Sequence, residues 1–145
     1  MTYSIKEVAE KTNLSIYTLR YYDKQGLLPF VSRNAAGYRT FTDSDLSLIH
    51  TICCLKNTDM KIKDIRQYIA YCMAGPDTIE ARKQLLRRHK QEVLDKRRKL
   101  TENLQEIDYK LAVYSNPHAR DIIDQERQAV TAEKTANQLA SWANQ

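Results

Sequence analysis

Three patterns predict a mainly α-helical fold. Between residues 4 and 73, apolar residues recur at helical spacing in short stretches, and polar residues that cap helix N-termini precede several of them. A turn-forming stretch at residues 33–39 interrupts these helices and predicts a small hairpin. After Pro76, apolar residues recur every seven positions, which is the spacing of a coiled coil. We therefore expect a small helical domain with a hairpin, followed by one long helix.

The first two helices are predicted to form a helix-turn-helix. Ser4 and Glu7 have the spacing of a capping box, so the first helix begins after Ser4. Residues 12–14 end it, because Asn13 tolerates the left-handed conformation better than most residues. Ser15 caps the second helix. Two helices joined in this way can place the second one in the major groove of DNA.

The second helix is predicted to have one apolar and one polar face. Ile16 and Leu19 point toward the first helix, and Tyr22 joins the core. The opposite face is polar, aromatic and basic, and it suits contact with DNA. The residues we expect to contact DNA there are Ser15, Tyr21 and the three predicted base readers Tyr17, Thr18 and Arg20.

A basic hairpin follows the second helix. Leu27 and Leu28 give an apolar anchor, and Pro29 prevents the helix from continuing. Residues 33–39 combine turn-forming residues with cations and an aromatic ring, which is typical of a wing beside a helix-turn-helix. We expect Arg33, Tyr38 and Arg39 to contact DNA, with both arginines facing phosphates.

Two further helices complete the small domain. Thr42 caps a third helix that runs to about residue 57. Its apolar arc comprises Leu46, Leu48, Ile49, Ile52, Cys53 and Leu55. Cys54 projects to the opposite side, beside His50 one helical turn earlier. The fourth helix is predicted from about residue 61 to residue 73, on the helical spacing of Ile62, Ile65, Ile69 and Met73.

Gly75 and Pro76 mark the boundary of this domain. The sequence therefore divides into a winged helix-turn-helix domain at 1–74, a linker and coiled-coil dimerisation helix at 75–116, and a tail at 117–145 that is partly helical. The tail is rich in Ala, Gln and Glu, and its apolar residues are scattered.

The long helix needs a partner to bury its apolar seam. From about residue 78 to residue 114 it would be about 55 Å long, whereas the preceding domain has a radius of gyration of about 11 Å. Its own domain cannot cover such a length, so the simplest partner is the same helix of a second copy, which gives a homodimer. The seam comprises Leu86, Val93, Leu100, Leu104, Ile107, Leu111 and Tyr114.

Three segments carry a resemblance to a known family. Thr18–Asp23, Gly26–Pro29 and Gly37–Arg39 (TLRYYD, GLLP and GYR) resemble, in this order and spacing, the signature of the MerR family of bacterial transcription regulators. The resemblance implies antiparallel pairing of the long helices and binding of double-stranded promoter DNA at a near-palindrome. It also implies that bending and untwisting the DNA acts indirectly on RNA polymerase, and that Lys61 contacts the DNA backbone.

A second resemblance concerns the response to a signal. Cys54–Asn57 and Glu80–Lys83 resemble the aldehyde- and electrophile-responsive branch of the MerR family, where a cysteine at this place is the proposed sensor. Cys54 lies off the apolar arc, and His50 and the nearby Lys56 favour its thiolate. We therefore expect Cys54, assisted by His50, to sense reactive aldehydes or other thiol-reactive stress.

Composition narrows the class of protein. A net charge of +5 and a pI near 9.1 favour an anionic partner. An odd number of cysteines, three, argues against a disulfide framework and fits a reducing compartment. The sequence has neither a membrane-length apolar run nor the layout of a signal peptide, so we expect a cytoplasmic protein without membrane contact.

Other functions remain open or are disfavoured. A regulator of this family that senses a non-covalently bound ligand is one alternative, and an architectural DNA-binding or interaction protein is another. Enzymatic function is disfavoured because the sequence shows no phosphate loop and no set of nucleophile, base and orienting acid. We expect no cofactor and no metal, since His89 and His118 alone do not make a metal site.

Overall fold

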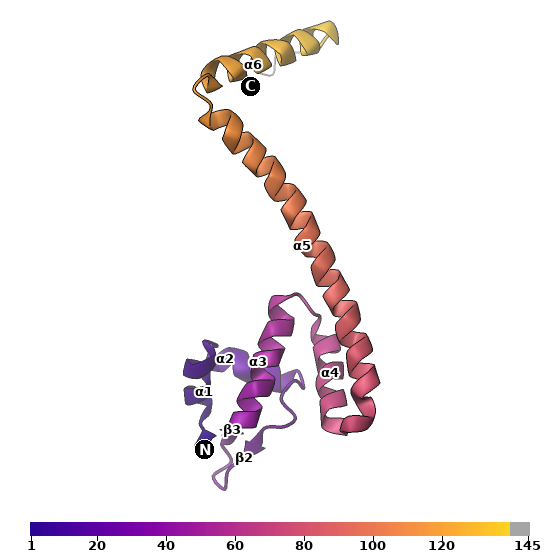
Figure 1. Cartoon of the computed structure of the whole chain (residues 1–145). Helices are drawn as coiled ribbons and strands as arrows, with labels where there is room; N and C mark the ends of the chain where they lie inside the picture. Colours follow the sequence, from indigo (N-terminus) through magenta and orange to yellow (C-terminus); the bar gives the residue numbers. More distant parts are fainter. Residues whose placement is uncertain (140–145) are drawn as a thin grey trace. The chain divides into compact units, whose positions relative to one another are not determined.

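The computed structural model describes residues 1–139 and confirms the mainly α-helical fold (Figure 1). The elements are, in order, β1 (Thr2–Tyr3), α1 (Ile5–Thr12), α2 (Ile16–Lys24), β2 (Ser32–Arg33), β3 (Arg39–Thr42), α3 (Asp43–Asn57), α4 (Ile62–Ala74), the 3-10 turn η1 (Pro76–Thr78), α5 (Ile79–Ser115) and α6 (Ala119–Ala136). They form two packing units, Met1–Val93 and Leu94–Gln145. The functional boundary at residue 74 stays a prediction, since the first packing unit also takes in the start of α5.

Side-chain caps define the helix-turn-helix. Ser4 Oγ accepts from the Glu7 backbone N–H at 3.2 Å, and Glu7 Oε2 accepts from the Ser4 N–H at 2.7 Å. The second of these bonds lowers the pKa of the Glu7 carboxyl. Asn13 ends α1 in the left-handed region at φ 55°, and Ser15 Oγ accepts from the Thr18 N–H at 2.9 Å. The predicted caps and turn are therefore confirmed.

The core of the first unit lies among α1, α2, α3 and α4. Val8 from α1 and Leu19 from α2 are fully buried, and Tyr22 lies beside them as predicted. Burial raises the pKa of the Tyr22 phenol. The other buried apolar side chains of this cluster are Leu27, Leu28, Phe41, Ile49, Ile52, Leu55, Met60, Ile65, Ile69 and Leu85.

A three-stranded antiparallel sheet carries the wing, with β3 in the middle. Arg33 pairs with Arg39 in the predicted hairpin, and Thr2 of β1 pairs with Thr42 on the other side of β3. The sequence pattern does not predict β1, because two residues are too few to show the alternation of a strand. Phe41 of β3 is fully buried and fixes the sheet to the helical core.

The third and fourth helices follow the predicted pattern. Thr42 Oγ1 accepts from the Asp45 N–H at 3.3 Å, and the Thr42 N–H donates to Asp45 Oδ2 at 2.8 Å, so a second capping box begins α3. α4 begins at Ile62, within one residue of the prediction, but Met73 in its last turn is 53% exposed. The apolar spacing of Met73 therefore does not place it in the core of this chain.

α5 takes part in both packing units. In the first, Leu85 is buried at 6% exposure, whereas its neighbour Leu86 on the predicted seam is 36% exposed. Heptad spacing selects Leu86 and misses Leu85, which packs on its own domain. In the second unit the seam residues Leu100, Leu104, Ile107, Leu111 and Tyr114 are all exposed in the single chain.

The predicted partly helical tail contains α6. A hydrogen bond from the His118 N–H to Asn116 Oδ1, at 2.8 Å, shapes the turn between α5 and α6. The part of the predicted tail beyond residue 139 lies outside the described residues.

Substitutions on the two faces of α2 are expected to differ in their effect on stability. Leu19→Ala leaves a cavity at a fully buried position, so we expect it to reduce the free energy of unfolding by about 2–5 kcal/mol. Tyr17→Ala on the same helix removes a side chain that is 79% exposed, and we expect a change within about 0.5 kcal/mol. Urea unfolding followed by circular dichroism measures both. Equal losses would show that α2 does not pack through Leu19.

Candidate nucleic-acid interface and thiol positions

The outward face of α2 is exposed to solvent. Tyr17 is 79% and Tyr21 is 42% exposed, and Arg20 is exposed as well. Ser15 and Thr18 have a second role, because the Ser15 hydroxyl caps α2 and lies 2.8 Å from the Thr18 hydroxyl. The face therefore offers two phenols and a guanidinium to a partner, next to two hydroxyls that already stabilise the helix start.

The wing is shaped by its own hydrogen bonds. Asn34 Oδ1 accepts from the N–H groups of Ala36 and Tyr38, both at 3.0 Å. Gly37 has φ 85°, a left-handed conformation that glycine adopts without strain, and its carbonyl accepts from Arg33 Nη1 at 2.7 Å. This turn leaves the Tyr38 ring 72% exposed at the tip of the wing. Arg33 and Tyr38 are thus presented to solvent on the same short hairpin.

An ion pair joins the wing to α2. Arg39 Nε donates to Asp23 Oδ2 at 2.7 Å, and both side chains are partly buried. The sequence pattern predicts a phosphate contact for Arg39 but not its pairing with Asp23, although both residues belong to the segments of the family signature. The two Nη atoms of Arg39 carry further donors that suit a phosphate. The ion pair can therefore fix the direction in which Arg39 presents them.

A second contact joins α4 to the end of α2. Arg66 Nε donates to the Gln25 carbonyl at 2.7 Å. Gly26 follows at φ 77°, and a Cβ at that position would lie 3.4 Å from Arg66 Nε. Gly26 therefore allows both the left-handed turn and the close approach of Arg66. This contact holds α4 against α2, and no pattern in the sequence predicts it.

Lys61 stands at the N-cap position of α4. Its side chain is exposed and makes no capping hydrogen bond. The N-terminus of a helix carries a partial positive charge and unpaired N–H groups, which attract anions. Lys61 thus adds a mobile cation at a place that already favours a phosphate.

The two adjacent cysteines of α3 differ in their surroundings. Cys54 is exposed, as its place off the apolar arc predicted, whereas Cys53 is half-buried. Burial raises the pKa of the Cys53 thiol, which disfavours its reactive thiolate. Exposure therefore makes Cys54 the more accessible thiol of the pair.

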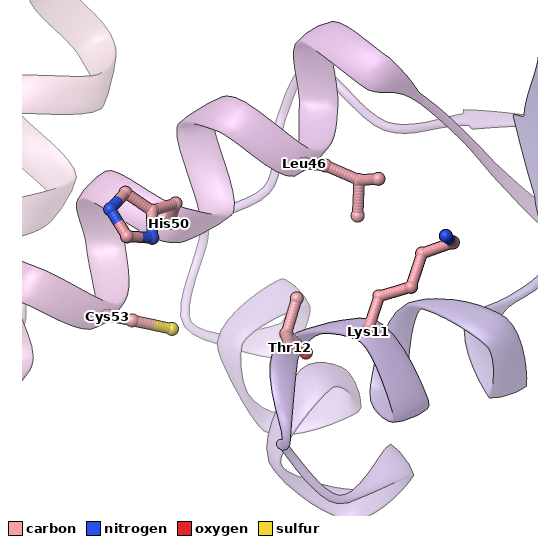
Figure 2. Close-up of a pocket in the computed structure, with 5 residues that line it drawn as sticks. All are labelled: Lys11, Thr12, Leu46, His50 and Cys53. Atoms are coloured by element: carbon pink, nitrogen blue, oxygen red, sulfur yellow. The ribbon is translucent and has the colours of Figure 1, made fainter.

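Cys53 faces a small cavity between α1 and α3 (Figure 2). The cavity measures about 250 Å³ and is lined by Lys11, Thr12, Leu46, His50 and Cys53. Figure 2 shows the Cys53 sulfur directed from α3 toward the side where Thr12 of α1 lies. His50, which sequence spacing placed beside Cys54, thus also lines the cavity that Cys53 enters.

Residues 1–139 contain neither a metal-binding cluster nor a helix that could cross a membrane. No three His, Cys, Asp or Glu side chains gather there in a way that could hold a metal ion. No helix in this part of the chain is both long and apolar enough to cross a membrane.

A helix-turn-helix with an exposed second helix and an attached wing defines a class of DNA-binding protein. The sequence pattern of the MerR HTH family regulatory proteins matches residues 3–72. An HTH-type transcriptional regulator of Haemophilus influenzae is 44% identical over 119 residues, which are 82% of this chain and 88% of the relative. The chain belongs to the MerR family of transcription regulators.

Two further relatives bear on the resemblance to one branch of this family. HiNmlR, a MerR family regulator lacking the sensor domain, has been crystallised bound to promoter DNA. Its structure matches with a TM-score of 0.73 and 45% identity, over 79% of this chain and 90% of the HiNmlR chain. The regulator AdhR of Bacillus subtilis is 34% identical over 92 residues, which are 63% of this chain and 66% of AdhR. The family resemblance is therefore confirmed.

The predicted phosphate contact of Lys61 can be tested through salt dependence. Each lost phosphate contact reduces the slope of log K against log salt by about 0.9, so we expect Lys61→Ala to reduce it by about 0.9 for each subunit bound. Lys110→Ala, which removes the same charge from the second packing unit, should leave the slope unchanged. Fluorescence anisotropy with operator DNA at several salt concentrations measures both. Equal slopes for wild type and Lys61→Ala would remove Lys61 from the interface.

Proposed function

We propose that the chain acts as a homodimer on promoter DNA, with α2 of each subunit in a major groove and the wing on the flanking backbone. The observation that carries this proposal is the exposed face of α2, held in place by the core on one side and by the Asp23–Arg39 pair on the other. The contacts would come from the residues predicted from the sequence: Ser15, Tyr17, Thr18, Arg20, Tyr21, Arg33, Tyr38, Arg39 and Lys61. The relative HiNmlR, bound to promoter DNA in its crystal structure, supports it.

The exposed seam of α5 supports the dimer. Five apolar side chains from Leu100 to Tyr114 are exposed at heptad-related positions of one helix. Burying each Leu or Ile of such a seam contributes about 1.5–3 kcal/mol, so the second half of α5 has a strong tendency to pair. Antiparallel pairing would separate the two α2 helices by the length of the helix pair and so set the spacing of the half-sites.

Activation would follow from a change in the shape of the bound DNA. A dimer that bends and untwists a promoter spacer brings the elements read by RNA polymerase into line without touching the polymerase. The deformation costs about 1–6 kcal/mol and is offset by contacts made only in the bent state. A signal needs to shift the dimer between two arrangements by a similar amount.

We propose Cys54 as the sensor of that signal. Its thiolate adds to the β-carbon of an α,β-unsaturated aldehyde, which forms the thioether bond while the carbon–carbon π electrons move to give an enolate. A proton from water then adds to the α-carbon and leaves a saturated aldehyde attached to Cys54. No oxidant or reductant is required. The exposed position of Cys54 on α3 and the resemblance of Cys54–Asn57 to the electrophile-responsive branch of the family support this assignment. The product is a bulkier and more polar group in the last turns of α3.

Substitution of each cysteine in turn tests whether Cys54 or the adjacent Cys53 is the sensor. We expect Cys54→Ser to keep operator binding but to lose induction by acrolein, because the nucleophile is absent. Cys53→Ser is the matched control and should keep both, since the Cys53 thiol is half-buried and its pKa is raised. In vitro transcription with RNA polymerase, together with intact-mass measurement of the adduct, gives both readouts. Induction that survives in Cys54→Ser would refute the sensor role.

A second candidate signal is a non-covalent ligand in the cavity between α1 and α3. The cavity offers an ammonium group and an imidazole beside an apolar wall. At about 250 Å³ it is smaller than the usual 300–1,000 Å³ of drug-sized sites, so only a very small ligand would fit. Leu46→Phe would narrow the cavity. Loss of induction in Leu46→Phe together with its retention in Cys54→Ser would favour this candidate.

The dimer can be tested on α5 itself. Ile107→Glu places a charge in the proposed seam, and we expect it to yield monomers and to weaken operator binding at least tenfold, since one half-site would have to bind alone. Tyr109→Glu is the matched control, because Tyr109 is also exposed but lies two residues away, outside the seam. Analytical ultracentrifugation gives the oligomeric state. A dimeric Ile107→Glu protein would exclude this seam as the interface.

A further inference from the structure

The start of α5 contacts its own domain through Arg82, Leu85 and His89. Arg82, Leu85 and His89 lie at positions i, i+3 and i+7, so they share one side of the helix. Leu85 is the buried side chain of this face, and the two polar residues flank it one turn away on either side. Both polar contacts and apolar burial therefore attach the start of α5 to the DNA-binding unit.

His89 bonds the residue that ends α3. Thr58 stands at the C-cap of α3, and its Oγ1 lies 2.9 Å from the Cys54 carbonyl oxygen and 2.7 Å from His89 Nε2. A hydroxyl has one proton to donate. With that proton on the Cys54 carbonyl, the Thr58 oxygen accepts from the His89 Nε2–H. A continuous chain of hydrogen bonds thus leads from the backbone of Cys54 to α5.

Arg82 holds the end of α4 in a comparable way. Its Nη2 donates to the carbonyls of Gly75 at 2.8 Å and Tyr71 at 3.1 Å, and its Nε donates to the Thr78 hydroxyl at 3.0 Å. Two of the Arg82 hydrogen bonds therefore tie α5 to the end of α4, and the third reaches Thr78, just before α5. His89 makes one hydrogen bond, to Thr58 at the end of α3. The bond to α3 is the one that a local disturbance can break while the Arg82 contacts persist.

We propose that the Thr58–His89 hydrogen bond couples the state of Cys54 to α5 and holds the uninduced arrangement. This inference rests on the proposed function of Cys54 as the sensor. Cys54 and Thr58 are four residues apart on one side of α3, and helical side chains lean toward the preceding turn, so the Thr58 side chain lies over the turn of Cys54. An adduct on the Cys54 sulfur competes for that space and displaces the Thr58 hydroxyl from His89. α5 is then released at its α3 contact and pivots at Arg82.

Substitutions at both ends of the bond test this coupling in the full-length protein. We expect Thr58→Val and His89→Leu each to raise transcription without acrolein about fivefold, the effect of one hydrogen bond on a two-state equilibrium, and to reduce the induction ratio by the same factor. The rate of adduct formation at Cys54 should stay at the wild-type value. The double variant should show no further change, because both substitutions remove the same bond.

Conservative variants separate coupling from stability. Thr58→Ser keeps the hydroxyl and His89→Gln keeps a donor near the place of Nε2, so both should behave like wild type. Thr51→Val is the matched control, since the Thr51 hydroxyl bonds the Ser47 carbonyl within α3. Thermal unfolding of each variant checks that the fold is intact.

Two outcomes would overturn the inference, and they differ in what they leave standing. If Cys54 is modified and induction still needs it, but Thr58→Val and His89→Leu behave like wild type, the coupling is wrong and the sensor role stands. If acrolein forms no adduct at Cys54, or Cys54→Ser is induced normally, the sensor role and the coupling both fail. Raised basal transcription in the Cys54→Ser, His89→Leu double variant would support the coupling without any adduct.

Discussion

The packing of α2 on the core fixes most of what this protein can do. Leu19 and Tyr22 bury one face of α2 among α1, α3 and the loop after α2. Because that face is fixed, the opposite face with Tyr17 and Arg20 is left rigid and exposed. A helix that is already rigid can enter a groove of DNA without the entropic cost of becoming ordered on binding. The apolar side of α2 therefore determines the geometry of its polar side.

Polar contacts then set the positions of the parts around α2. The Asp23–Arg39 pair orients the wing, and the Arg66 contact with Gln25 holds α4. Each is a single charge-assisted contact in a partly exposed place, so each adds little to overall stability. These two contacts matter because they orient the cationic side chains of the wing and of α4.

Polar contacts also attach α5 to the DNA-binding unit, and in our proposal they serve regulation. The end of α4 has carbonyl groups that need donors, and Arg82 of α5 supplies them. At the end of α3 the Thr58 hydroxyl donates to the Cys54 carbonyl, and His89 of α5 bonds that hydroxyl. A joint made of few hydrogen bonds and the buried Leu85 is easier to shift than a wide apolar interface. Such a joint, next to an exposed thiol, suits a protein that must respond to a chemical signal.

Local patterns in the sequence determined the helices, the caps of α1, α2 and α3, the hairpin and the exposed side of Cys54, because capping and periodicity involve residues only a few positions apart. Three short segments of the sequence also carried the resemblance to the MerR family. Tertiary structure alone decided the pairing of β1, the burial of Leu85 instead of Leu86, the partner of Arg39 and the bond between Thr58 and His89. These contacts join residues 16 to 40 positions apart, or depend on which side of a helix meets another element. Helical periodicity says that a face is apolar, but only packing decides which neighbour covers it.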